Sequence, residues 1–541
     1  MPLNILSCVM GIPSFYRQLV KTNPSLIRQK NSALASVLAL DLNCAIYHCL
    51  AKLQKKTPFE PTKRVEFEDS LIKMVIQYIV KLRDHVQPTN VLYVAVDGVV
   101  PMAKIRQQRM RRFKSVWQTA EENKIKGTEG KEGWDRNAIT PGTDFMDKLT
   151  KRLEEWGKVQ IGGPKTIISG VYASGEGEQK IMSYLRETPP LGEVVVYGLD
   201  ADLIVLCLWH LREYGWSFKL LREEVEMTGG VKVNEKGEEN LLYFDINQLA
   251  SILNDRWAGV DLRDYVGAMS FLGNDFVPHG LTLCIREDGI DRLMEILHEI
   301  GKPLVIKDVE GFWTYDKEVL MTLVKTVASN EKKWILSSLA KKLKMSSRGY
   351  PPKPGAAEPS EIEKQMNALN LLPLNWKVER SLADRDEETG WYLLDNWAET
   401  YYEKFLWGAP AERSVEEWLK AVQWILNYYT GSKPVDMLWY YPWYLPPLFT
   451  DVLKYGGCVN SDNGVSNIVN PITPIAQLIM VLPIESYALL PTNKRGLPFK
   501  NPEYYPKAWT FFSAGRRMLW ECEPMIPMLP YSVIAKFLRL R

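Results

Sequence analysis

The sequence contains few of the residues on which thiolate or imidazole metal sites depend. Its 541 residues include seven cysteines and five histidines, and no two cysteines have the C-x-x-C spacing. This scarcity excludes a zinc module of the finger or ribbon type. Scattered cysteines without a disulfide framework are typical of a reducing compartment, so we expect an intracellular protein, in the cytoplasm rather than the nucleus.

Long apolar runs and a strong excess of one charge are also missing. No stretch of about 18 apolar residues is free of charge, so we expect no transmembrane helix and no membrane partner. The N-terminal sequence MPLNILSCVMGIP lacks the basic start and the cleavage pattern of a secretory signal. Lysine and arginine number 67 against 65 acidic residues, a formal net charge of +2. This balance excludes a diffusely basic binder and leaves room for a local basic patch.

Three short apolar runs in the first half of the chain each end in an aspartate. They are SVLALD (36–41), VLYVAVD (91–97) and EVVVYGLD (193–200). Runs that are apolar on both faces are typical of buried parallel strands. Longer stretches with a helical pattern accompany them: 68–84, 103–124 and 143–157. This alternation predicts an α/β domain with a parallel sheet.

Acidic residues gather at the positions where a parallel sheet places its ligands, outside the carboxyl ends of the strands. Glu176 and Glu178 in ASGEGEQK, like Asp200 and Asp202 in GLDADLIV, have an acid-x-acid spacing that puts both side chains on one side of an extended segment. Any one acid alone is more simply a cap or turn residue. The full set is Asp41, Asp97, Glu176, Glu178, Asp200, Asp202 and Asp275.

Seven converging carboxylates repel one another unless cations offset their charge. Hard divalent cations with oxygen ligands fit such a site, whereas thiolate or imidazole sites do not. Two such ions about 4 Å apart can activate water and stabilise the leaving oxygen of an in-line phosphoryl displacement.

A basic stretch, PMAKIRQQRMRRFKSVW (101–117), begins shortly after Asp97. In a helix, one face carries Lys104, Gln108, Arg111 and Arg112. Such a face can grip a phosphate, because arginine offers bidentate forks and lysine a point charge. The alternative is a solvated basic helix.

The second half of the chain has a different character. SSRGYPPKPGAAEPS (346–360) is rich in proline, glycine and serine, and helical, aromatic stretches follow at 391–408 and 414–431. We therefore expect an α/β nuclease domain at 1–330, a linker or surface loop at 331–360, and a mainly helical, aromatic-rich region at 361–541.

Motifs along nearly the whole chain resemble the XRN family of 5′→3′ exoribonucleases, in the family's order. In the first half these are MGIPSFYRQL (10–19), LDLNCAIYHC (40–49), VDGVVPMAKIRQQRMRRF (96–113), ITPGTDFM (139–146), ASGEGEQKIM (173–182), YGLDADLIVL (197–206), LLREEV (220–225) and FLGNDFVPH (271–279). In the second half they are YYEKF (401–405), WLKAVQWILNYYTG (418–431), WYYP (439–442), AQLIMVLPIESYALLP (476–491) and WECEPMIPMLP (520–530).

The resemblance implies a PIN/flap-endonuclease-like α/β domain backed by a second conserved, mainly helical region. It implies Mg²⁺-dependent, processive hydrolysis of single-stranded RNA from a 5′-monophosphate end to nucleoside 5′-monophosphates, as in mRNA decay, with two ions and Mn²⁺ as a possible substitute. By motif, the seven acids match the family's metal ligands. The basic face of Lys104, Gln108, Arg111 and Arg112 matches its 5′-phosphate pocket, which a cap or triphosphate is too large to enter.

The family also stacks the first base between a Trp and a His. Trp439 matches the Trp, whereas the position of the His holds Tyr47 and the next residue is His48, so the resemblance implies Tyr47, His48 and Trp439 as the base-stacking residues. Nine residues precede Met10, and the long C-terminal domains and zinc knuckle of other members are missing, so we expect a near-minimal enzyme. Two alternatives stay open. One is an inactive RNA-binding scaffold of the same fold. The other is a flap-type DNA 5′ nuclease, although FVPHGLTLCIREDGIDRLMEIL (276–297) lacks that class's glycine-rich helix-turn-helix.

Overall fold

The computed structural model describes most of the chain. The described residues are 15–31, 33–129, 133–160, 162–198, 200–224, 231–233, 239–348, 358–458 and 469–539. The start of the MGIPSFYRQL motif and the residues before Met10 lie outside these ranges, as do residues 349–357 of the proline-rich stretch.

A mixed seven-stranded sheet forms the core of the first half and confirms the predicted α/β class. Five neighbouring strands are parallel, and the order across the whole sheet is β1-β7-β6-β5-β2-β3-β4. β7 pairs antiparallel with β6, and β1 antiparallel with β7. The bounds are β1 Ile27–Arg28, β2 Ala35–Asp41, β3 Val91–Ala95, β4 Lys165–Ser169, β5 Glu193–Tyr197, β6 Phe218–Glu223 and β7 Leu241–Asp245.

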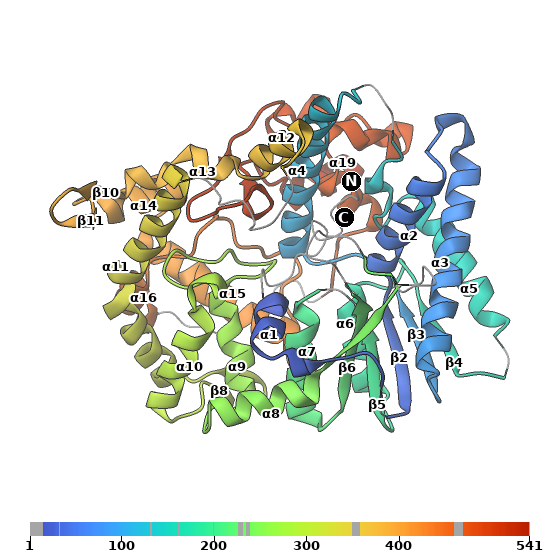
Figure 1. Cartoon of the computed structure of the whole chain (residues 1–541), viewed down its shortest axis with the longest axis horizontal. Helices are drawn as coiled ribbons and strands as arrows, with labels where there is room; N and C mark the ends of the chain where they lie inside the picture. The colour runs from blue at the N-terminus through green and yellow to red at the C-terminus, as the bar shows by residue number, and fades with distance from the viewer. Residues whose placement is uncertain are drawn as a thin grey trace.

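Helices cover both faces of this sheet, as the continuously apolar strands require. Along β2, Leu38 and Leu40 pack into one apolar cluster while Val37 and Ala39 pack into another, which is the period of two expected for a strand. α2 (Leu42–Lys56), α3 (Arg64–Val86) and α5 (Asp144–Lys158) cover the first face (Figure 1). The second face carries α1 Phe15–Thr22, α6 Gly177–Glu187, α7 Asp202–Tyr214 and α8 Ile246–Arg256, and α9 Leu262–Met269 packs on α7.

The second region is mainly helical, as predicted. Two helices precede its expected start at residue 361, α10 Gly289–Ile300 and α11 Lys317–Arg348. The others are α12 Glu361–Asn370, α13 Leu372–Trp376, α14 Trp397–Phe405, α15 Ala411–Thr430, α16 Phe449–Tyr455, α17 Pro474–Val481, α18 Leu497–Lys500 and α19 Tyr531–Leu538. Three two-stranded hairpins accompany them: β8 Val305–Lys307 with β9 Trp313–Tyr315, β10 Ala383–Asp386 with β11 Gly390–Leu393, and β12 Phe511–Phe512 with β13 Glu523–Pro524.

The structure differs from the expected boundary at residue 330. That position lies inside α11, which continues without a break through residues 331–348. The helix persists because its apolar stripe does: Val327, Ile335, Leu339 and Leu343 are all buried at helical spacing. The proline-rich stretch that suggested a linker begins only at the end of this helix.

α4 (Met102–Lys126) carries the basic stretch and stands between the sheet and the second region (Figure 1). It is confirmed as a helix, but most of its basic side chains are buried rather than solvated. Arg109 is fully buried and donates hydrogen bonds to the carbonyl oxygens of Met480, at 2.7 Å, and of Pro527 and Tyr504. These contacts fix the C-terminal segments against α4. No described helix combines the length and apolar character needed to cross a bilayer.

Candidate metal and phosphate site

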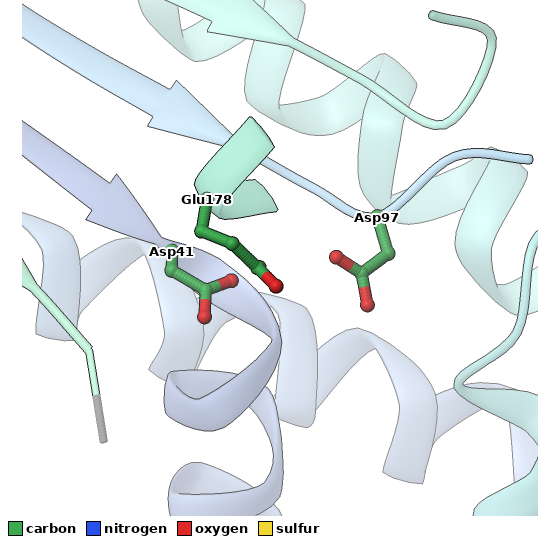
Figure 2. A group of neighbouring side chains, drawn as sticks. All are labelled: Asp41, Asp97 and Glu178. Atoms are coloured by element: carbon green, nitrogen blue, oxygen red, sulfur yellow. The ribbon is translucent and has the colours of Figure 1, made fainter. Parts of the chain in front are cut away.

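Three carboxylates converge at the carboxyl edge of the sheet. Asp41 is the last residue of β2, Asp97 follows the neighbouring parallel strand β3, and Glu178 lies in the first turn of α6. One oxygen from each of the three lies within 4.8 Å of the others, and Figure 2 shows their side chains turned toward a common space. The sheet therefore brings together three of the seven predicted acids within reach of one cation.

A glycine allows α6 to approach this edge. An added Cβ at Gly177 would lie 2.4 Å from Oδ1 of Asp41, closer than non-bonded atoms approach. The backbone N–H of Gly177 also donates a hydrogen bond of 2.8 Å to Oδ1 of Asp97. Gly177, which separates Glu176 from Glu178, thus allows α6 to lie close to the end of β2.

Two polar side chains hold Asp97 in place. Asn43 donates to Oδ2 of Asp97 at 2.6 Å, and its own Oδ1 accepts the Asp97 backbone N–H at 3.3 Å. Nζ of Lys180 donates to the carbonyl oxygens of Val96 and Gly170, at 2.6 and 2.8 Å. The carboxylate and the backbone that carries it are therefore both fixed before any cation binds.

The other acids lie around Lys104. Its Nζ is 2.7 Å from Oδ2 of Asp275 and forms an ion pair with Glu176. Burial alone would lower the pKa of Lys104, but Asp275 and Glu176 raise it well above its usual value. Asp202 and Asp200 belong to the same electrostatic neighbourhood, because the Asp275 carboxylate raises the pKa of both. Lys104 thus acts as an internal counter-ion of the acid cluster.

Burial and mutual repulsion shift the acids in one direction. Burial is the largest cause that raises the pKa of Asp41, and the charges of Asp97 and Asp200 add to it. The pKa of Asp200 reaches about 7, chiefly because it is buried. Burial likewise raises the pKa of four more acids: Asp97, Glu178, Asp202 and Asp275. A cluster in which carboxylates resist ionisation is one that a bound cation would stabilise.

Two buried oxygen atoms in the cluster have no hydrogen-bond partner among the described residues. They are Oδ1 of Asp41 and Oδ1 of Asp202. Buried polar atoms are rarely left unpaired in folded proteins. Because all candidate ligands are carboxylate oxygens, the cluster suits a hard divalent cation such as Mg²⁺ or Mn²⁺.

The predicted phosphate face of α4 continues from the acid cluster. Gln108 and Arg112 are buried; Gln108 accepts from Gln477 at 3.4 Å, and Arg112 donates to Oδ1 of Asn137 at 2.8 Å. Burial lowers the pKa of Arg112 to about 10. Arg111 is half-buried, and its charge lowers the pKa of Asp200 and Asp275. Lys104 and Arg111 therefore lie beside the acids, while Arg112 lies on the same face toward Asn137.

The predicted base-stacking residues are divided between two places. Trp439 is buried, donates to Oε2 of Glu417 at 3.0 Å and lies against Trp424 with ring centroids 5.4 Å apart. Tyr47 is half-buried on α2 and interacts electrostatically with Arg112, on the phosphate face.

His48 lies apart from these residues. It is buried against Tyr78, and its Nε2 is 2.6 Å from Oε1 of Glu239. The structure thus leaves Tyr47 beside the phosphate face and does not bring His48 to the site. The stacking role of Tyr47 and Trp439 stays a prediction.

The sequence predicts neither the role of Lys180 nor a contact between the helical region and the acid cluster. The hydroxyl of Tyr428, on α15, donates a hydrogen bond of 2.7 Å to Oε2 of Glu176. The only available signal was its place in the aromatic motif WLKAVQWILNYYTG, which does not distinguish a core tyrosine from one that reaches the acids.

Comparison with known proteins adds independent information. The family model described as the XRN 5′-3′ exonuclease N-terminus matches residues 10–224, and the model described as the Xrn1 helical domain matches residues 260–368. Together the two models cover more than half of the chain. The second match also crosses residue 330, in agreement with the continuous α11.

Curated relatives match over much of the chain. Human 5′-3′ exoribonuclease 1 is 28% identical over 96% of this chain and 33% of its own length. The 5′-3′ exoribonuclease 1 of Saccharomyces cerevisiae is 26% identical over 96% of this chain and 42% of its own length. The 5′-3′ exoribonuclease 2 of the same yeast is 31% identical over 59% of this chain and 38% of its own length. The chain thus spans between a third and about two-fifths of the length of these relatives.

Proposed function

Because the chain belongs to the XRN family of 5′-3′ exonucleases, we propose that it is a metal-dependent 5′→3′ exoribonuclease. Its substrate is single-stranded RNA with a 5′-monophosphate, which it degrades processively to nucleoside 5′-monophosphates in RNA decay. The observation that carries this proposal is the convergence of Asp41, Asp97 and Glu178, with one oxygen of each within 4.8 Å of the others.

The residues of the acid cluster fit Mg²⁺, with Mn²⁺ as a substitute. Asp41, Asp97 and Glu178 would hold one ion, and the acids around Lys104, namely Glu176, Asp200, Asp202 and Asp275, would supply the ligands of a second. When bound, such ions activate a water molecule and stabilise the leaving oxygen of a phosphodiester. The unpaired Oδ1 atoms of Asp41 and Asp202 are the ligand atoms that this assignment requires.

The chain's own residues prepare the site for that chemistry. Asn43 and the Gly177 N–H orient the carboxylate of Asp97, and Tyr428 orients that of Glu176. Lys104 offsets part of the negative charge, so that a phosphodiester approaches a less repulsive cluster.

The face of α4 supplies the selectivity for the 5′ end. Lys104, Gln108, Arg111 and Arg112 lie one to two turns apart on one side of the helix. A 5′-monophosphate adds an anion to this basic face, which a 5′-hydroxyl does not supply. Tyr47 and Trp439 are the side chains proposed to stack on the first base.

We also propose a cytoplasmic location. The basic stretch RQQRMRRFK (106–114) has the composition of a nuclear import signal, but Arg106, Arg109, Arg112 and Lys114 are buried within the fold. An import receptor has no access to them in the folded protein. A fluorescent fusion found in the cytoplasm agrees with this location, and a nuclear one contradicts it.

One assay tests the function directly. RNA of one sequence is prepared with a 5′-monophosphate, a 5′-hydroxyl or a 5′-triphosphate and incubated with the protein in Mg²⁺ or in EDTA. We expect nucleoside 5′-monophosphates from the first substrate alone, and only in Mg²⁺. Binding without cleavage would favour the inactive scaffold, and cleavage of flapped DNA in place of RNA would favour the DNA nuclease.

A further inference from the structure

A cavity of about 110 Å³ lies next to the acid cluster and shares Asp275 with it. Its wall is formed by the turn that carries Asp275, by one side of α4 and by residues 512–523 of the C-terminal segment. Apart from Asp275, none of the seven acids and none of the four residues of the phosphate face lines it. It is therefore distinct from the site described above.

The turn that forms one wall of this cavity is tightly fixed. Gly273 adopts φ +85°, and an added Cβ there would lie 2.4 Å from the backbone nitrogen of His279. Oδ1 of Asn274 accepts the N–H groups of Phe276 and Val277 at 2.9 and 3.0 Å. The cavity is thus bounded by a rigid turn rather than by a loose loop.

An unpaired amide lines the cavity. Gln107 is 4% exposed, yet neither its Nε2 nor its Oε1 has a hydrogen-bond partner among the described residues. It lies one turn after Lys104 on α4 and is a lining residue of the cavity. A buried amide without partners is costly to the folded state, and a ligand in the cavity would offset that cost.

Four acidic side chains also line the cavity, and each forms an ion pair. Asp275 pairs with Lys104, Glu521 with Arg286 and Glu523 with Arg106. Glu287 pairs with both Lys341 and Arg517. The negative charge at the cavity wall is therefore already offset, in part by cations that lie outside the wall.

Two lining cations form no ion pair with any described carboxylate: Lys114 and Arg516. Nζ of Lys114 donates to the carbonyl oxygens of Trp520 and Cys522, at 2.8 and 2.7 Å. Arg516 is 4% exposed and contacts the ring and the carbonyl oxygen of His279. Two buried positive charges thus line the same cavity as the unpaired amide of Gln107.

The titration behaviour of these groups agrees with this arrangement. Burial lowers the pKa of Lys114 to about 8 and that of Arg516 to about 10. Burial, together with the Arg516 charge, also lowers the pKa of His279 well below its usual value, so the ring is neutral. An anion in the cavity would stabilise the charged forms of Lys114 and Arg516 and so offset the cost of burying them.

We propose that the cavity binds a tetrahedral oxyanion of the size of a phosphate group, held by Gln107, Lys114 and Arg516. The volume fits this class of ligand. It exceeds the ~10–15 Å³ of probe-occupied space that one water molecule needs and is smaller than the ~150 Å³ cavity that holds benzene, so it has room for a group of a few heavy atoms such as a phosphate. The anion is either free phosphate or the phosphate of a nucleoside monophosphate whose nucleoside stays outside.

The first test is calorimetric titration of the full-length chain with inorganic phosphate, without metal and without RNA. We expect saturable binding that Gln107→Leu or Lys114→Met weakens roughly tenfold or more, since each removes a hydrogen bond to a charged group. Lys126→Met, an exposed change on the same helix, is the matched control and leaves the affinity unchanged. Gln107→Leu replaces an unpaired amide by an apolar group of similar size, so the fold is retained.

Adenosine 5′-monophosphate distinguishes the two sources. Equal affinity for inorganic phosphate and the nucleotide identifies the phosphate group alone as the ligand, and tighter nucleotide binding identifies the monophosphate as the source. Tungstate soaked into crystals locates the site independently, with anomalous density expected beside Gln107 and Arg516.

The results that overturn the proposal are equally specific. They are no phosphate binding to the wild-type chain, binding that Gln107→Leu leaves unchanged, or phosphate affinity lost on Arg111→Ala, which would place the anion on the face of Arg111 and Arg112. The test does not depend on nuclease activity. Asp200→Asn should still bind phosphate in the cavity, so failure of the proposed function leaves a positive result intact.

Discussion

The hydroxyl of Tyr428 lies 2.7 Å from Oε2 of Glu176 and donates a hydrogen bond to it, so that a side chain of the helical region reaches the acid cluster of the sheet domain. The Tyr428 ring stacks on Trp424, with centroids 4.9 Å apart and an interplanar angle of 15°. Trp424 in turn contacts Trp439. One continuous aromatic path therefore joins a proposed metal ligand to a proposed base-stacking residue.

The first prediction concerns this contact. Tyr428→Phe keeps the ring stacking but removes the donor that orients Glu176. We expect turnover of 5′-monophosphate RNA to fall roughly tenfold, as is typical when a group that orients a metal ligand is lost. The half-saturating Mn²⁺ concentration, followed by electron paramagnetic resonance, should rise with it.

The neighbouring residue provides the control. The hydroxyl of Tyr429 is buried without a partner among the described residues. Its removal in Tyr429→Phe should leave turnover and Mn²⁺ binding unchanged and the stability unchanged or higher. Equal effects of the two variants would show that Tyr428 serves only as packing.

The second prediction separates chemistry from binding. Asp200→Ala and Asp202→Ala each remove one carboxylate from a cluster whose members repel, so the fold should persist. We expect hydrolysis to be abolished while RNA affinity, measured by fluorescence anisotropy, changes little. Asp255→Asn, an exposed acid at the end of α8, is the control. Normal turnover in either alanine variant would contradict the metal assignment.

The third prediction concerns the choice of the 5′ end. Arg111→Ala removes a guanidinium of the proposed phosphate face. We expect kcat/KM on 5′-monophosphate RNA to fall by roughly tenfold to a hundredfold, the usual range for a charge-assisted contact, with a much smaller change on 5′-hydroxyl RNA. An equal loss on both substrates would assign Arg111 a structural role instead.

The fourth prediction follows from the close approach of α6 to β2. Gly177→Ala places a methyl group 2.4 Å from the present position of Asp41 Oδ1. The carboxylate must move, and a displacement near 1 Å at a reacting centre costs roughly a hundredfold in rate. Gly133→Ala, where an added Cβ meets no atom within 4 Å, should be silent. Circular dichroism checks that both variants fold.

The fifth prediction concerns pH and Lys114. Burial lowers its pKa from 10.5 to about 8. Between these two values the unfolded chain holds the proton more strongly than the folded chain, so this lysine makes the free energy of unfolding rise with pH across the window. The free energy of unfolding in urea should rise less between pH 8 and pH 10 in Lys114→Met than in the wild type. An identical rise in both proteins would contradict a buried Lys114 with a lowered pKa.

Much of the sheet and of the acid set could be predicted from the sequence. Apolar runs that end in Asp41 and Asp97 encode both a buried strand and a ligand at its end, because parallel strands present their carboxyl ends at one edge. The basic stretch of α4 was equally readable as a helix. These patterns involve only residues close together in the chain, so they can be recognised in a single sequence.

Other features depend on contacts between distant segments. Lys104 pairs with both Asp275 and Glu176, and Arg109 donates to carbonyl oxygens near the C-terminus. Both roles follow from tertiary packing, which the spacing of residues along the sequence does not predict. His48 is a predicted stacking residue next to Tyr47, yet the rotation between successive residues of a helix turns it toward Glu239. The continuation of α11 past residue 330 was hidden by the proline-rich stretch beyond it.

The direction and processivity of cleavage are measured by following both ends of one RNA. A 5′-monophosphate RNA labelled at its 5′ and 3′ ends is digested by a limiting amount of protein in Mg²⁺, with EDTA as the parallel reaction. For a processive, metal-dependent 5′→3′ exoribonuclease, we expect the 5′ label to appear at once as nucleoside 5′-monophosphate. The 3′ label should stay in full-length RNA or pass directly to mononucleotide, and EDTA should stop both. Labelled fragments of intermediate length from internal cuts, or equal cleavage in EDTA, would contradict this activity.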